Sequence, residues 1–185
     1  MIWENNDDIR VIQCTNNGRT IQNHLSECRE ERRPYLFITS TMTIKPLRRL
    51  LVPVSMLEET YKAEISTYIA RKTGAHIILL QANDYGSHAQ QNVNRIVTHI
   101  QKLNERIDQP ISYEIVKARK DSFSLIKEAS ERQRDFQHDL LILTASREYG
   151  LDDWLFGPPE RHAIKHALVP VMLVNPREDL FSLCD

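Results

Sequence analysis

Between residues 47 and 176, four short apolar runs of strand length and one alternating segment are separated by stretches whose apolar residues recur at helical spacing. The alternating segment, Ile111–Val116, is expected to be a strand near the edge of the sheet. An apolar run of this kind indicates a strand that is buried on both faces of a sheet. Strands that alternate with helices form a parallel sheet covered by helices on both sides. We therefore predict an α/β fold with a five-stranded, mostly parallel sheet, whose strands are Arg49–Val54, Ala75–Gln81, Ile111–Val116, Asp139–Thr144 and Val169–Val174.

Local signals predict where the helices between these strands begin and end. Ser55 and Glu58 match a capping box, in which each side chain satisfies a backbone N–H of the other residue, so a helix is expected to start at Ser55. Gly74 predicts the end of that helix, because glycine readily adopts the left-handed conformation found there. Later helices are expected at Val93–Leu103, after Asp121 or Ser122, and from Pro158 onward.

Residues 1–46 carry a shorter pattern of the same kind. We expect strands at 8–14 and 34–39 and a helix at 20–32 between them. This segment is assigned as an N-terminal strand–helix–strand extension, ahead of a main domain at 47–176.

The extension resembles the end of the main domain. Arg33-Pro-Tyr-Leu-Phe-Ile echoes Val169-Pro-Val-Met-Leu-Val, and both segments follow a strand and a helix. Two interpretations stay open: a remnant half-domain repeated from the second part of the chain, or an unrelated extension. Residues 177–185 form a C-terminal tail after the last expected strand.

The composition narrows the class of protein. Apolar residues make up 41% of the chain and charged residues 26%, which is typical of a soluble globular protein. The formal net charge of -1 provides no overall basic field, so we expect no nucleic-acid partner. We see no signal peptide and no apolar run long enough to cross a membrane. Three cysteines without a closely spaced pair indicate reduced thiols and a cytoplasmic protein.

Three stretches of the main domain resemble the universal stress protein family. The third is the most specific, because its two glycines and its Val-Pro-Val strand fall at the family's spacing. The resemblance implies an adenine-nucleotide alpha-hydrolase-like fold, a role in stress response and dimers paired through the last strand. An extension before a full domain is similar to a shortened tandem-domain member. The stretches are Leu50–Val54 with the following helix and Gly74–Leu80, then Asp139–Leu143, then Gly150–Gly157 with His166–Val174.

The same resemblance implies an ATP site, with several replacements. Family members that bind ATP carry Gly-x2-Gly-x9-Gly-Ser/Thr after the fourth strand, and only Gly157 matches here. Ser55 replaces the aspartate that usually follows the first strand. The implied positions of the site are Pro53, Ser55, Ala82, Thr144, Arg147, Gly157 and Pro158.

Physical chemistry predicts that these replacements weaken phosphate binding. Thr144 and Arg147 place side chains where glycines would let backbone N–H groups approach a phosphate. Pro158 and the next proline remove N–H donors from the helix start, and Glu160 adds a carboxylate there that repels phosphate. Arg147 is open to two interpretations, a substitute phosphate ligand or an ion-pair partner of nearby carboxylates. Ser55 is interpreted either as a helix cap or as a nucleotide contact.

Two other groups stand near the expected site. His162 and His166 share a helix face and could ligate a metal, but no third ligand is evident, so we interpret them as solvent-facing and predict no metal. Trp154 is interpreted either as part of a contact surface or as a cap on the core.

The sequence therefore predicts a non-enzymatic, universal stress protein-like protein with a degenerate ATP loop, which acts through dimerisation or protein contacts without a cofactor. The alternative is a nucleotide-binding stress protein with an altered phosphate site, whose cofactor would be ATP. We expect a homodimer through Val169–Val174 and no membrane partner. Pro34–Thr39 could pair with that strand instead, within one chain or between chains.

Overall fold

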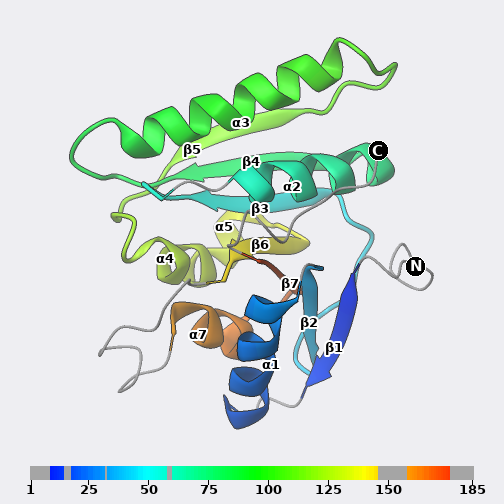
Figure 1. Cartoon of the computed structure of the whole chain (residues 1–185), viewed down its shortest axis with the longest axis vertical. Coiled ribbons are helices and arrows are strands. Elements are labelled where there is room, and N and C mark those ends of the chain that lie inside the picture. Colours follow the sequence, from blue (N-terminus) through cyan, green and yellow to red (C-terminus); the bar gives the residue numbers. More distant parts are fainter. Residues whose placement is uncertain (1–8, 15–17, 32, 58–59, 146–157, 176–185) are drawn as a thin grey trace.

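The computed structural model describes residues 9–14, 18–31, 33–57, 60–145 and 158–175, in which strands and helices alternate (Figure 1). None of the described helices is long and apolar enough to cross a membrane. In chain order the elements are β1 (Arg10–Cys14), α1 (Gly18–Glu30), β2 (Tyr35–Thr39), β3 (Arg49–Val54), α2 (Thr60–Thr73), β4 (His76–Gln81), α3 (His88–Asn104), β5 (Tyr113–Lys117), α4 (Leu125–Glu131), α5 (Gln133–Phe136), β6 (Leu140–Thr144), α7 (Pro159–His166) and β7 (Val171–Val174).

The strands form one sheet in the order β1-β2-β7-β6-β3-β4-β5. Every pair of neighbours is parallel except β2 and β7, which are antiparallel. The predicted α/β class and mostly parallel sheet are confirmed, and all five predicted strands of the main domain are present. The sheet has seven strands rather than five, because β1 and β2 of the N-terminal extension continue it beyond β7.

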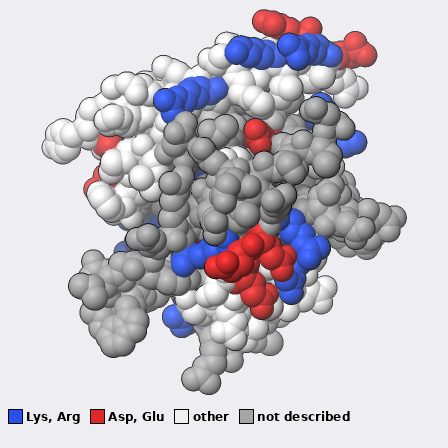
Figure 2. All heavy atoms as spheres, in the orientation of Figure 1, with Lys and Arg blue, Asp and Glu red and all other residues white. Residues whose placement is uncertain are grey.

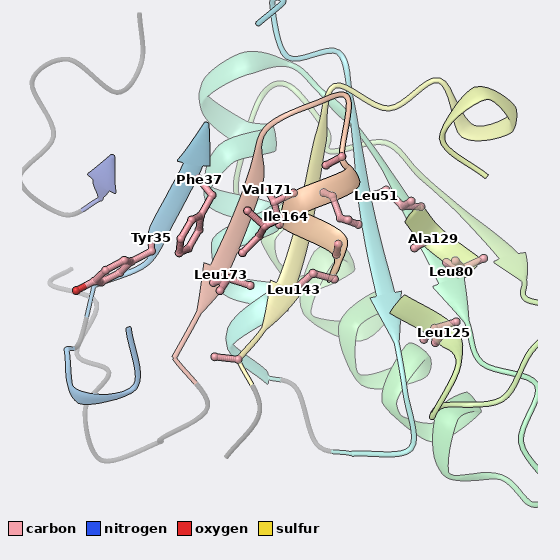
Figure 3. Packing of buried hydrophobic residues seen from close by; sticks show 14 of the residues in the cluster. Tyr35, Phe37, Leu51, Leu80, Leu125, Ala129, Leu143, Ile164, Val171 and Leu173 are labelled. Carbon is pink, nitrogen blue, oxygen red and sulfur yellow. The ribbon is translucent and has the colours of Figure 1, made fainter. Parts of the chain in front are cut away.

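Helices cover both faces of the sheet, as Figure 1 shows. One face packs against α1, α4, α5 and α7, and the other packs against α2 and α3. Alternation along each strand decides which side chain enters which layer: Leu51 points into the first layer, while Leu50 and Val52 point into the second. Figure 3 shows the first layer, in which Phe37 of the extension and Leu173 of β7 lie in one continuous apolar cluster.

The units β1–α1–β2 and β6–α7–β7 pair in a two-fold symmetric pattern. Each unit has two parallel strands, and the units meet where β2 runs antiparallel to β7. Leu36 lies opposite Met172 at the centre, with the pairs Tyr35–Leu173 and Phe37–Val171 on either side. Leu36 and Met172 also hold the same position in the two similar sequence segments, so the pairing is symmetric about equivalent residues.

The symmetry extends to the residues that precede the paired strands. Arg10 donates its backbone N–H to the carbonyl of Pro34 over 2.9 Å, and Leu141 donates its own to the carbonyl of Pro170 over 3.1 Å. The chain therefore builds the same backbone unit twice, once at each end of its described part. The alternative in which Pro34–Thr39 pairs with the last strand is the arrangement found within this chain.

Two helices begin later than predicted. The helix α2 begins at Thr60 rather than Ser55, and the Ser55 hydroxyl instead accepts the N–H of Leu57 at 3.2 Å. The helix α4 begins at Leu125, after a turn in which Asp121 accepts the N–H of Ser124 at 3.1 Å. In both places a short polar side chain stabilises a turn of the loop instead of the first turn of the helix.

Candidate functional site

The site lies where the winding direction of the sheet reverses. The chain runs from β3 through β4 to β5, and then returns to place β6 on the other side of β3. Ligands of such sheets bind outside the carboxyl ends of the strands at this point. The pairing of β3 with β6 is confined to Leu50–Leu140 and Leu51–Leu141, so the carboxyl ends are not paired to each other. We define the carboxyl-end site by the described residues Pro53, Ser55, Ala82, Thr144 and Pro158.

A buried lysine anchors the end of β3. Lys62, in the first turn of α2, is only 3% exposed, and its ammonium group donates a hydrogen bond to the Pro53 carbonyl. A buried ammonium group is costly unless it is hydrogen-bonded, so this contact fixes Lys62 at the strand end. The Ser55 carbonyl, two residues further along the chain, accepts the Asn92 amide at 2.9 Å.

The ends of β4 and β6 complete the site. Ala82 is buried and donates its N–H to the carbonyl of Val54 over 3.0 Å, which places it directly beside the end of β3. Thr144 ends β6, and its buried hydroxyl makes no hydrogen bond within the described part of the chain. Pro158 is buried and immediately precedes α7.

The start of α7 is electrostatically unusual. Its first residue is Pro159, which has no N–H, and the N–H of Arg161 already donates to the Pro158 carbonyl at 3.0 Å. Glu160 is 1% exposed in this first turn. Burial is the main reason that the pKa of the Cys28 thiol is raised to about 12, and the charges of Glu31 and Glu160 add to the rise against the opposing charge of Arg29. The buried carboxyl group of Glu160 therefore lies close to Cys28 of α1.

The structure brings together four of the seven predicted positions at neighbouring strand ends, namely Pro53, Ser55, Ala82 and Thr144. Pro158 lies at the start of the following helix. Arg147, Gly157 and Trp154 lie outside the described residues.

Two polar residues of this region were missed by the sequence analysis. Lys62 and Asn92 both occupy buried positions on otherwise apolar helix faces. The signal was present in the spacing: Lys62 falls three residues before Ile65, and Asn92 falls four residues before Ile96. A polar residue in the apolar register of a helix indicates a specific buried partner, although the spacing does not identify that partner.

The rings of the two histidines of α7 lie next to each other at the surface, with their planes tilted by 42°. The ring centroids of His162 and His166 are 4.4 Å apart, and both side chains are exposed. The pKa of His162 is lowered by partial burial and by the neighbouring charge of His166. Within the described residues, no three histidine, cysteine or acidic side chains come together as a possible metal site.

A separate hollow of about 550 Å³ lies along α3. It is lined only by side chains of that helix and contains none of the predicted site residues. Charged side chains elsewhere are mixed in sign: Figure 2 shows an acidic cluster with basic side chains on both sides of it.

Similarity to known proteins comes from the structure alone, because no protein-family model and no curated protein matches the sequence. Among solved structures, a universal stress protein from Archaeoglobus fulgidus DSM 4304 superposes with a TM-score of 0.65 over 93% of this chain at 14% identity. The chain has the universal stress protein fold. A functionally unknown protein from Pseudomonas aeruginosa PAO1 is also similar, with a TM-score of 0.52 over 94% of this chain at 13% identity.

Both solved structures are longer than this chain. The similar region covers 62% of the Archaeoglobus protein and 64% of the Pseudomonas protein. The universal stress protein fold therefore accounts for nearly all of this chain but for less than two thirds of either of these chains.

Proposed function

We propose that the protein is a non-enzymatic, universal stress protein-like regulator that acts through protein contacts and has lost tight ATP binding. The observation that carries this proposal is the buried carboxylate of Glu160 in the first turn of α7. A helix that binds phosphate presents free backbone N–H groups and the positive end of its dipole. Here a carboxylate already occupies the positive end, and Pro159 contributes no N–H.

The carbonyl groups at the end of β3 support the same proposal. Lys62 binds the Pro53 carbonyl, and Asn92 donates to the carbonyls of Ser55 and Leu57 at 2.9 and 2.7 Å. The chain's own side chains thus satisfy this strand end without a ligand. A ligand would have to compete with hydrogen bonds that are already formed and partly buried.

One observation favours the alternative function, a nucleotide-binding stress protein with an altered phosphate site. The Lys62 ammonium group and the buried Thr144 hydroxyl both lie at carboxyl ends of adjacent strands. A cation and a hydroxyl are groups that recognise phosphate oxygens. In this alternative, ATP is the cofactor, and Arg147 would add a second cation from the segment outside the described residues.

Calorimetric titration of ATP with magnesium separates the two functions. We expect no binding at millimolar ATP for the wild type. A micromolar dissociation constant that weakens at least tenfold in Arg147→Ala or Lys62→Met would overturn the proposal and establish the altered phosphate site. Arg71→Ala, an exposed arginine of α2, is the matched control for Arg147→Ala. Thermal unfolding of Lys62→Met checks that the variant is folded before its titration is interpreted.

Dimerisation is the least constrained part of the proposal. Within one chain, β7 already pairs with β6 on one side and β2 on the other. A homodimer through Val169–Val174 therefore requires β2 of one copy to leave β7, or to pair with β7 of the second copy. Light scattering of the full chain and of a variant lacking residues 1–44 tests this part. A dimer that forms equally well in both would contradict exchange of β2.

A further inference from the structure

Three loops at the carboxyl end of the sheet are tied together by a small polar knot. Ser122, after β5, donates its N–H and its hydroxyl to the carboxylate of Asp84, after β4. The same Ser122 hydroxyl accepts the N–H of Met56, after β3, at 2.8 Å. Asn83 donates its N–H to the Lys120 carbonyl at 2.9 Å, which joins the second and third loops again. These contacts hold three loops of different strands in one fixed arrangement.

The knot carries an unusual concentration of exposed apolar side chains. Of eight large apolar side chains that are exposed in the described residues, four lie on these loops, next to or within the knot. Two of them are aromatic and almost fully exposed, with 107% exposure for Tyr85 and 83% for Phe123. We call the four together the apolar rim, which consists of Met56, Leu57, Tyr85 and Phe123.

Exposed apolar side chains have an unfavourable solvation free energy. Several of them gathered in one region of a protein surface typically mark an interaction site. The loops are not held in place by the apolar rim, because the knot and the Asn92 contacts to Ser55 and Leu57 already do so. Aromatic side chains on a prearranged backbone are the residues that dominate protein–protein interfaces. The arrangement therefore favours a binding surface over a structural role.

The charges beside the apolar rim indicate the chemistry of the partner. Lys117 and Arg119 are exposed and form no ion pair within the described part of the chain. The nearby carboxylates are engaged, since Asp84 accepts from Ser122 and Asp121 accepts the Ser124 N–H at 3.1 Å. The backbone from Lys117 to Lys120 runs directly beside the Gln81–Asn83 segment that leads to Tyr85. Two exposed cations that form no ion pair within the described residues thus border the apolar rim.

We propose that the apolar rim, with Lys117 and Arg119, binds an acidic peptide segment of a partner protein that inserts apolar side chains against Tyr85 and Phe123. This inference deepens the proposed function and rests on it only in the claim that the protein acts through protein contacts. An acidic peptide is favoured over a nucleic acid because the formal net charge of -1 provides no overall basic field, and because the aliphatic side chains of Met56 and Leu57 suit apolar contacts with a peptide.

Selection from two peptide libraries tests the proposal on the full chain. Both libraries place Leu, Phe or Trp at alternate positions; one carries Asp or Glu between them and the other carries Lys or Arg. We expect the acidic library to be enriched and a selected acidic peptide to bind in the micromolar range. Equal enrichment of both libraries, or none of the acidic one, would show that the apolar rim has no such partner.

Variants then locate the selected peptide. Phe123→Ser and Tyr85→Ser should each weaken binding at least tenfold, while Leu168→Ser, an exposed apolar residue of the α7–β7 loop, should leave it unchanged. Charge reversal at Lys117 and Arg119 should weaken binding at least tenfold and remove its salt dependence. Reversal at Lys45 and Arg71 is the matched control for charge. Equal losses in test and control variants would contradict the proposed surface.

Two further measurements distinguish this inference from nucleic-acid binding and from the proposed loss of ATP binding. If a single-stranded oligonucleotide displaced the selected peptide from the protein, the assignment to an acidic protein segment would be overturned. Micromolar ATP binding would overturn the proposed function, whereas peptide binding that depends on Phe123 would still establish the docking surface. Failure of the peptide selection alone would leave the loss of ATP binding untouched.

Discussion

The two β-α-β units at the ends of the chain have the same backbone but opposite surroundings. In β1–α1–β2 the outer strand has one neighbour, whereas in β6–α7–β7 the equivalent strand lies between β7 and β3. Equivalent residues follow this difference: Arg10 at the sheet edge corresponds to Leu141 in the centre, which is fully buried. Position in the sheet, and not the local backbone, therefore decides whether a residue is charged or apolar.

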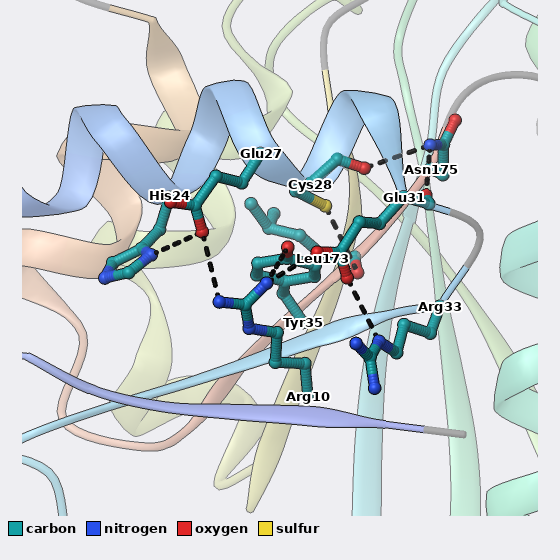
Figure 4. Close-up of polar contacts among 9 residues, drawn as sticks. All are labelled: Arg10, His24, Glu27, Cys28, Glu31, Arg33, Tyr35, Leu173 and Asn175. Atoms are coloured by element: carbon teal, nitrogen blue, oxygen red, sulfur yellow. Dashed lines mark hydrogen bonds and ion pairs between the residues drawn. The ribbon is translucent and has the colours of Figure 1, made fainter. Parts of the chain in front are cut away.

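The edge unit carries an ionic network between its outer strand and α1, which Figure 4 shows. Arg10 donates to Glu31 at 2.6 Å and to the Tyr35 hydroxyl at 2.9 Å, and it lies 3.5 Å from Glu27. Burial and the charge of Glu31 raise the pKa of Tyr35 to about 12, so its hydroxyl stays protonated. Four predictions test how far the two units differ, from the largest expected effect to the smallest.

Truncation of equivalent core residues tests whether the two units share one core. Phe37 and Leu173 are both fully buried in the same cluster. Phe37→Ala and Leu173→Ala should each lower the free energy of unfolding by about 3 to 5 kcal/mol, since both leave a cavity. Chemical denaturation followed by two probes should show a single transition for both. A separate early transition in Phe37→Ala alone would show that the edge unit unfolds independently.

Acid should destabilise the central unit through His138, which precedes β6. Its ring is 4% exposed, and burial lowers its pKa from 6.5 to about 4. Because the unfolded state takes up the proton first, this contribution is present above pH 6.5 and is lost between pH 6.5 and 4. The loss should be about 3 kcal/mol. The free energy of unfolding, measured by chemical denaturation at several pH values in this range, should fall more steeply with decreasing pH in the wild type than in His138→Leu. Equal pH dependence in the two proteins would rule out this histidine as the cause.

The Asn175 side chain links the end of β7 to the end of α1. Asn175 donates to the carbonyls of Cys28, Arg29 and Glu31 at 3.0, 2.9 and 2.6 Å, at the end of α1. Asn175→Ala should cost about 2 to 3 kcal/mol, because buried carbonyl groups lose their donor. The equivalent residue of the edge unit is Thr39, whose hydroxyl contacts that of Thr41 at 2.9 Å. Thr39→Val should cost about 1 kcal/mol or less, and a larger loss than in Asn175→Ala would reverse the comparison.

The ionic network should contribute least. The side chains of Arg10 and Glu31 are 36% and 31% exposed, so solvent screens their attraction. Arg10→Ala should lower the free energy of unfolding by about 1 kcal/mol at low salt and by less at about 1 M salt. Urea denaturation at both salt concentrations measures the difference. A loss that does not depend on salt would assign the effect to stacking of Arg10 on Tyr35, where the guanidinium lies 5.2 Å from the ring centroid.

Much of this architecture could be predicted from local patterns. Apolar runs identified the central strands, because a strand buried on both faces must be apolar at successive positions. The edge strand β5 was identified from the alternation in Ile111–Val116 instead. The echo between 33–38 and 169–174 left two interpretations open, and pairing of Pro34–Thr39 with the last strand within one chain, which the structure shows, was one of several alternatives. Helix starts were less predictable: Ser55 and Ser122 match cap patterns but stabilise loop turns, since a hydroxyl bonds whichever N–H the tertiary structure presents.

The candidate site also has parts that could be predicted from the sequence and parts that could not. Its strand-end positions, such as Pro53 and Ala82, follow from strand order alone, because the carboxyl ends of parallel strands lie at one edge. The contacts of Lys62 with Pro53, of Asn92 with Ser55 and of Ser122 with Asp84 join residues from different elements. No local pattern contains such partners, so they could not be predicted from spacing.

The sequence by itself determined the α/β class and the strands, because these depend on periodicities within short segments, but it left open whether the N-terminal β-α-β unit is a repeat. Only the tertiary structure decided that β2 pairs with β7 within the same chain, so that the seven described strands form one sheet. It also decided that three loops gather into the knot beneath Tyr85 and Phe123. Those outcomes depend on which surfaces meet, and contacts between distant segments are selected by the packing free energy of the whole chain.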